Sequence, residues 1–153
     1  MTQARRCIAF RFLTTLTHKQ EDILIAGFQS IILRVKKSIG LVLQILKSKP
    51  YTLLANEQTK SIISMLEIGK NNIDDFVWLH KTGETEYTFK FSSYFFDSLN
   101  PVALPSRLKH LTNFSSKIRE YINGKFKNEI CQRMKIKQTD VMVIFSEVEE
   151  RWN

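Results

Sequence analysis

Residues 61–91 read SIISMLEIGKNNIDDFVWLHKTGETEYTFKF, and the order of patterns in this stretch decides the predicted fold. The first six residues form a short helix pattern, and a tight turn follows in which Gly69 is available for a positive φ angle. A second helix is predicted over residues 71–80, beginning at an Asn cap. Two helices joined by a short turn make a helix-turn-helix.

A turn and a strand pattern follow directly. The turn is centred on Gly83, and Tyr87, Phe89 and Phe91 then alternate with polar residues, which predicts a strand with one buried face. Helix, turn, helix, wing and strand in that order is the winged-helix arrangement. We therefore expect a mostly helical α+β protein with small β-wings, in which residues 51–100 form a winged helix-turn-helix.

Residues 1–50 are expected to form a strand and a long amphipathic helix. Thr17 is the predicted N-cap, and Gln20 stands three residues later, as in a capping box. Gly40 leaves two options open: one continuous helix, or a break followed by a short strand. Apolar residues recur at steps of three or four and predict one buried helix face: Leu24, Phe28, Ile31, Val35, Ile39, Val42 and Ile45.

Residues 101–153 are expected to form a second helix-turn-helix-like unit, cut short before its wing because the chain ends at Asn153. Apolar residues from Cys131 to Ile144 fall on the core positions of such a unit, although Lys135 stands where Gly commonly opens the turn. The alternative is a buried strand over residues 141–145, which have high strand propensity, after a helix that ends at residue 134.

Three stretches carry a resemblance to a known family: YTFKFSSYFFDSL at 87–99, LPSRLKHL at 104–111 and FSSKIREYI at 114–122. Together they resemble winged-helix plasmid replication initiators, over roughly residues 55–150. In that family a wing strand leads through a short helix and a Leu-Pro connection to a second winged-helix domain. The resemblance implies sequence-specific binding of repeated origin sequences in duplex DNA and recruitment of host replication proteins. This chain departs from the family by ending at Asn153, so a tandem pair would have its second unit truncated. A shortened initiator, a related regulator and another winged-helix DNA-binding protein are all open.

The formal net charge of +8 on 153 residues is unevenly distributed. Residues 1–50 hold nine Lys or Arg against two acids, residues 51–100 hold four against seven, and residues 101–153 hold ten against six. Basic surface attracts phosphate, whether on nucleic acid or on an anionic membrane. The alternative is a lysine-rich surface that is merely solvated.

We expect DNA contacts around the first helix-turn-helix and in the basic stretch that follows it. Asn can bond adenine bidentately, so Asn71 and Asn72 are the candidate base readers, with a cap or turn role as the alternative. The predicted phosphate contacts are Lys70, Lys81, Arg107, Lys109, Lys117 and Arg119.

Catalytic and cofactor motifs are weak in this sequence. His18, His80 and His110 lie far apart, and Cys7 and Cys131 form no CxxC pair. No apolar stretch is long enough to span a bilayer. We therefore expect a reduced cytoplasmic protein that is not an enzyme, holds no metal or cofactor and has no membrane partner.

Two other classes stay open. One is a basic ribosome-associated or RNA-binding protein in which Tyr87, Phe89 and Phe91 stack on bases. The other has strands over residues 7–12 and 141–145 flanking long helices, giving two β-α-β units. Tautomerase-like proteins have such units, but Thr2 replaces their catalytic N-terminal proline. The oligomeric state is also open, with a homodimer as one option.

Overall fold

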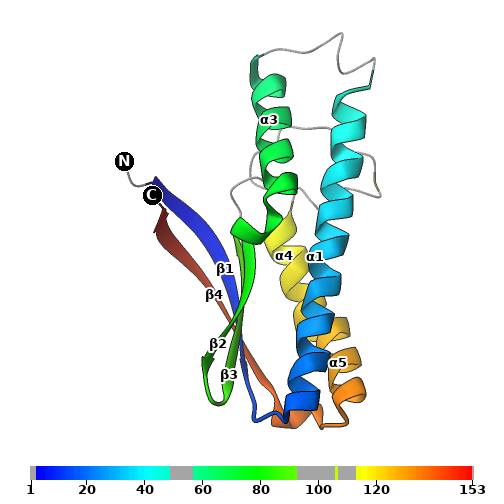
Figure 1. Ribbon diagram of the computed structural model, residues 1–153, viewed down its shortest axis with the longest axis vertical. Helices are drawn as coiled ribbons and strands as arrows, with labels where there is room; N and C mark the ends of the chain where they lie inside the picture. The colour runs from blue at the N-terminus through cyan, green and yellow to red at the C-terminus, as the bar shows by residue number, and fades with distance from the viewer. Residues whose placement is uncertain (1–2, 49–56, 93–105, 107–112, 153) are drawn as a thin grey trace.

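Four antiparallel strands form one sheet, and the helices lie on one side of it (Figure 1). The computed structural model describes residues 3–48, 57–92, 106 and 113–152. The α+β class predicted from the sequence is confirmed. The strands are β1 (Gln3–Leu13), β2 (Val77–Gly83), β3 (Glu86–Ser92) and β4 (Met142–Trp152). The helices are α1 (His18–Leu46), α3 (Glu57–Asn71), α4 (Phe114–Tyr121) and α5 (Lys127–Met134), with a π-helical turn at Ile122–Phe126 between the last two.

The strand order is β2-β3-β1-β4, so β1 and β3 occupy the centre of the sheet. Segments 1–50, 51–100 and 101–153 all supply strands to this one sheet. Strand, helix, two strands, helix and strand in this spatial order is the split β-α-β, or ferredoxin-like, connectivity. Helix α3 is an addition to the first crossover. The predicted alternative of two β-α-β units, with strands over residues 7–12 and 141–145, therefore placed strands where β1 and β4 lie.

Helix α1 begins where the sequence predicts. The backbone N–H of Gln20 donates to Thr17 Oγ1 at 3.2 Å, and that of Thr17 donates to the Gln20 side chain at 2.9 Å, which completes the capping box. Gly40 lies inside the helix, so the option of a break and a strand after it is wrong. The predicted apolar face is buried at Leu24, Phe28, Ile31, Val35, Ile39 and Val42, and half-buried at Ile45.

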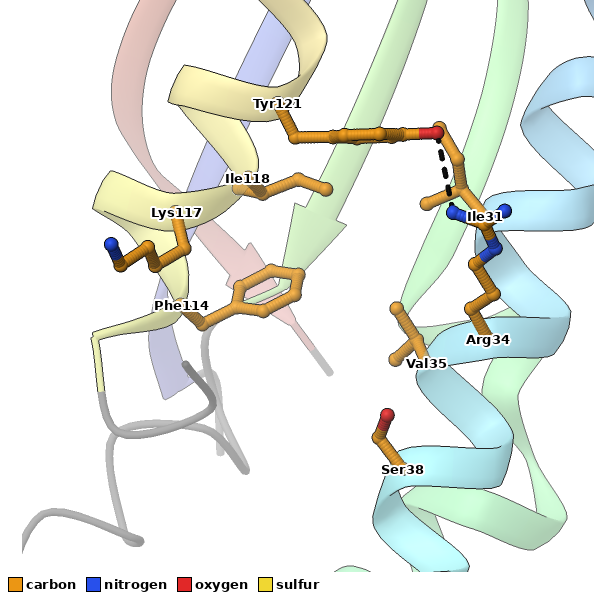
Figure 2. A pocket seen from close by; sticks show the side chains of 8 residues that line it. All are labelled: Ile31, Arg34, Val35, Ser38, Phe114, Lys117, Ile118 and Tyr121. Atoms are coloured by element: carbon orange, nitrogen blue, oxygen red, sulfur yellow. Dashed lines mark hydrogen bonds between the residues drawn. The ribbon is translucent and has the colours of Figure 1, made fainter. Parts of the chain in front are cut away.

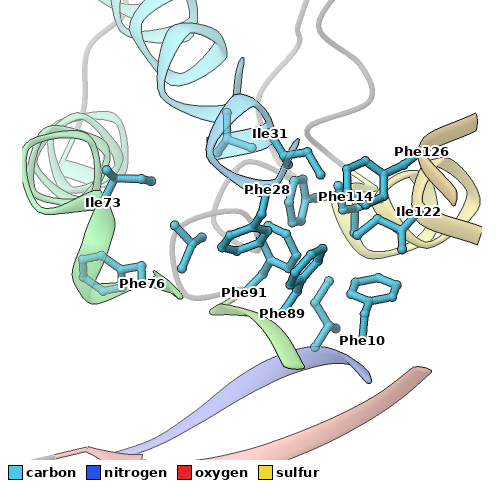
Figure 3. Close-up of a cluster of buried hydrophobic side chains, with 14 of the residues drawn as sticks. Phe10, Phe28, Ile31, Ile73, Phe76, Phe89, Phe91, Phe114, Ile122 and Phe126 are labelled. Atoms are coloured by element: carbon cyan, nitrogen blue, oxygen red, sulfur yellow. The ribbon is translucent and has the colours of Figure 1, made fainter. Parts of the chain in front are cut away.

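Aromatic side chains from α1, β1 and β3 fill the middle of the core (Figure 3). Phe28 stacks on Phe89 with ring centroids 4.2 Å apart, and Phe10 meets Phe91 edge-on at 6.1 Å. Tyr87, Phe89 and Phe91 are at most 2% exposed, which confirms the predicted strand and its buried aromatic face, but Thr88 and Ser92 on the other face are buried as well. These three rings therefore have no surface on which a base could stack, and that part of the RNA-binding alternative is wrong.

The helix-turn-helix predicted within residues 51–100 does not form. Helix α3 continues through the predicted turn at residues 67–70, and the residues predicted as a second helix form a 3₁₀ turn at Ile73–Asp75 and then β2. Strand β2 pairs with β3, placing Leu79 opposite Phe89. The apolar run before His80 gains a hydrogen-bonded neighbour and a buried surface in this pairing, and such tertiary contacts override weak helix propensity.

The second helix-turn-helix-like unit is also replaced by a helix followed by a strand. Helix α5 ends at Met134, and Lys135, where Gly was expected, adopts the left-handed conformation with φ 59°. A 3₁₀ turn at Gln138–Asp140 leads into β4, which pairs with β1 from residue 142 to residue 152. The order of a helix followed by a strand is thus confirmed, but the strand is not buried as predicted, because Met142 is 59% exposed and residues 143–145 are only half-buried. The π-helical turn was not predicted.

Gly27 permits a close approach between α1 and the α4–α5 segment. A Cβ atom added at Gly27 would lie 2.7 Å from Ile130 Cδ1 and 3.2 Å from Phe126 Cε1. A Cβ atom added at Gly124, in the π-helical turn, would meet nothing within 4 Å. The two glycines therefore differ in what a methyl group would do to the packing.

We predict that Gly27→Ala lowers the free energy of unfolding and that Gly124→Ala does not. Overpacking a core typically costs about 1–3 kcal/mol, whereas replacing a helical Gly by Ala gains roughly 0.5–1 kcal/mol. A net loss of about 1 kcal/mol is expected for Gly27→Ala in urea denaturation. Equal stability of the two variants would contradict the close packing at Gly27.

Glu21 ties the first turn of α1 to the β2–β3 hairpin. Lys81 Nζ donates to Glu21 Oε1 at 2.7 Å, and Tyr87 Oη donates to the same oxygen at 2.5 Å. The hydrogen bond from Lys81, followed by that from Tyr87, holds the pKa of Glu21 below its ordinary value. The same contact with Glu21 raises the pKa of Lys81. An ionised Glu21 therefore favours the folded state.

We predict that Glu21→Gln lowers Tm at neutral pH and that this difference shrinks on acidification. A carboxyl whose pKa is lowered by folding stabilises above its unfolded pKa, about 4.3 for Glu, and that contribution is lost as the pH falls through the folded pKa. Melting curves between about pH 7 and about pH 3 test this. Glu84→Gln is the control at the exposed hairpin tip, and a pH-independent effect of Glu21→Gln would contradict the assignment.

Candidate nucleic-acid interface

Helices α1 and α3 run side by side (Figure 1) and line a groove of about 950 Å³. The charged residues along this groove are four lysines and one glutamate. Gln44 and Asn71 add side-chain amides. The charged lining residues are Lys36, Lys37, Lys47, Lys70 and Glu67.

The helical repeat explains why the lysines gather here. On α1, Lys37, Gly40, Gln44 and Lys47 follow one another at steps of three or four, along the side opposite the buried face. Lys70 comes from the last turn of α3 and reaches α1 at Gly40, where an added Cβ atom would lie 3.4 Å from Lys70 Nζ. Gly40 therefore leaves room for the amine of Lys70 against the α1 backbone.

Three of these lysines lack a counter-ion in the described part of the chain. Lys47 pairs with Glu67 across the groove. Lys36, Lys37 and Lys70 have no carboxylate within ion-pair distance among the described residues. The lysine ammonium groups in the groove repel one another and attract anions. The groove is therefore suited to binding phosphate.

The groove contains two of the residues predicted as DNA contacts, Lys70 and Asn71. Asn72, the other predicted base reader, does not line the groove. Its side-chain amide donates to the backbone carbonyl of Ile68 at 2.9 Å, at the end of α3. The alternative cap role is therefore the one that the structure supports for Asn72.

The remaining predicted phosphate contacts do not line this groove. Lys81 pairs with Glu21 at 2.7 Å, and Lys117 lies 3.8 Å from Glu120. The guanidinium carbon of Arg119 lies 4.3 Å from the ring centroid of Phe145, in a cation-π contact. Each of these three cations thus already has a partner. Arg107 and Lys109 lie outside the described residues.

Lys36, Lys37 and Lys47 are groove residues that were not predicted as DNA contacts. A signal for them exists in the sequence, because residues 1–50 carry the largest excess of basic residues. The pairing of α1 with α3 adds Lys70 to this set, and that pairing depends on contacts between residues far apart in the chain.

Comparison with known protein families, curated proteins and solved structures finds no match for this chain. Within the described ranges, His, Cys, Asp and Glu side chains form no group of three or more that could hold a metal ion. No helix described there has the length and apolar character needed to cross a membrane. Cys7 and Cys131 are buried, and burial raises the pKa of the Cys131 thiol. The lysine groove thus offers the clearest functional chemistry.

Proposed function

We propose that this protein binds duplex DNA through phosphate contacts made in the α1/α3 groove. The observation that carries the proposal is the gathering of Lys36, Lys37 and Lys70, which lack a described carboxylate partner, beside the ion-paired Lys47. Lysines that neutralise phosphates release condensed counterions, so binding of this kind weakens steeply as salt is added.

The composition of the groove favours a duplex over a single strand. Proteins that hold single strands generally stack bases on aromatic side chains, and the groove is lined by no aromatic residue among those described. Gln44 and Asn71 stand beside the lysines, and side-chain amides can bond adenine in the wide major groove of B-DNA. The narrow major groove of A-form RNA does not admit them.

Duplex DNA is the ligand both in this proposal and in the prediction from the sequence, but the part of the protein that contacts it differs. The winged helix expected from the sequence would read bases with a recognition helix, whereas the groove contacts mainly the phosphate backbone. A role in initiating plasmid replication, recruitment of host replication proteins and a cytoplasmic location stay predictions. The same holds for the absence of enzymatic activity and for a homodimer.

We predict that the triple variant Lys36→Gln/Lys37→Gln/Lys70→Gln binds duplex DNA weakly and with less salt dependence. Each phosphate contact contributes about −0.9 to the slope of log K against log salt concentration for B-DNA. Loss of three contacts should therefore reduce the magnitude of the slope by about 2–3. The measurement is a salt titration by fluorescence anisotropy with a labelled duplex, with duplex RNA and single-stranded RNA in parallel.

The matched control is Lys19→Gln/Lys125→Gln/Lys137→Gln, which removes the same charge from exposed lysines outside the groove. The control should keep the slope of the wild-type protein. Equal losses in the two triple variants would mean that net charge alone drives binding. Stronger binding of RNA than of duplex DNA would contradict duplex DNA as the ligand.

A gain in affinity is expected for Glu67→Gln. This change removes the acid from the groove lining and releases Lys47 from its ion pair. One charge acting over several ångströms in a well-solvated groove is worth a few tenths of a kcal/mol to about 1 kcal/mol, or roughly a 2- to 5-fold gain. The readout is the same anisotropy titration at low salt. Weaker binding by Glu67→Gln would contradict phosphate contact at Lys47.

A further inference from the structure

A second cavity, of about 170 Å³, lies on the opposite side of α1, between this helix and α4 (Figure 2). Its walls are apolar, with Ile31 and Val35 from α1 and Phe114 and Ile118 from α4. The ring of Tyr121 lies across one end. No residue lines both the cavity and the lysine groove, although Arg34 of the cavity stands three positions before Lys37 of the groove on α1. The two sites are therefore separate.

Two polar groups of α1 flank this apolar space. Arg34 extends to the end closed by Tyr121, where its Nη1 donates to Tyr121 Oη at 3.5 Å, and the Ser38 hydroxyl lies toward the other end (Figure 2). In the described part of the chain Arg34 has no carboxylate partner and Ser38 Oγ makes no hydrogen bond. The amine of Lys117 points away from the cavity. Arg34 is thus the cation available to a ligand.

The size and the polarity of the cavity together define a class of ligand. An apolar protein cavity of about 150 Å³ holds one benzene ring, so 170 Å³ is enough for one ring. A guanidinium has five N–H donors and pairs with carboxylates in a bidentate geometry. We propose that this cavity binds a one-ring aromatic carboxylate, with its ring between Val35 and Ile118 and its carboxylate on Arg34.

The backbone next to the cavity supports this assignment independently. The π-helical turn Ile122–Phe126 begins directly after Tyr121. Single π-helical turns are rare within helices and recur at functional sites. Here the turn interrupts the α4–α5 segment directly after Tyr121, which closes the end of the cavity and contacts Arg34.

The test is a titration of the 153-residue chain with benzoate, followed through labelled methyl groups of Ile and Val. We expect saturable shifts at Ile31, Val35 and Ile118, with a dissociation constant on the order of 1 mM for so small a ligand. Benzyl alcohol, which has the ring without the charge, should bind about 10-fold more weakly. No DNA is present, so this result and the DNA titration can fail separately.

Three variants test whether Arg34 binds the carboxylate of benzoate. Arg34→Gln should weaken benzoate binding about 10-fold. Lys19→Gln, which removes the same charge from α1 away from the cavity, should bind like the wild-type protein. Tyr121→Phe keeps the ring and releases Arg34, and should bind benzoate at least as tightly. The proposal is overturned if benzoate causes no saturable shift in the wild-type protein, or if Arg34→Gln and Lys19→Gln bind alike.

Discussion

Phe28 of α1 stacks on Phe89 of the central strand β3 with ring centroids 4.2 Å apart, and Phe89 also lies 4.7 Å from Phe12 and 5.9 Å from Phe126. One ring thus joins α1, both central strands and the π-helical turn. Because this cluster excludes water from aromatic surface on four elements, it fixes which face of α1 is turned toward the sheet. The orientation of every other α1 side chain follows from it.

With that face fixed, helical geometry gives the remaining sides of α1 different surroundings. One side meets α3 and carries the lysines at 36, 37 and 47, and the opposite side meets α4 and carries Arg34 and Ser38. A basic groove and a small apolar cavity therefore arise from one 29-residue helix. Both proposed activities depend on the same aromatic packing, although they use separate residues.

Local signals in the sequence were sufficient where the interaction itself is local. The capping box at Thr17, the buried face of α1 and the alternation of Tyr87, Phe89 and Phe91 were all predicted correctly, because caps and periodicity involve residues a few positions apart. The helix predicted over residues 71–80 was wrong. Its apolar run is compatible with either a helix or a strand, and pairing with β3 stabilises the strand.

The sequence by itself determined the α+β class, the start and the buried face of α1, and the excess of basic charge in residues 1–50. The tertiary structure alone decided the strand order, the position of Lys70 beside the lysines of α1, and the apolar cavity beside Arg34. The physical reason is distance along the chain. Each of these features needs contacts between residues that are far apart in sequence, and hydrophobic burial, which is not directional, selects the partners only when the whole core assembles.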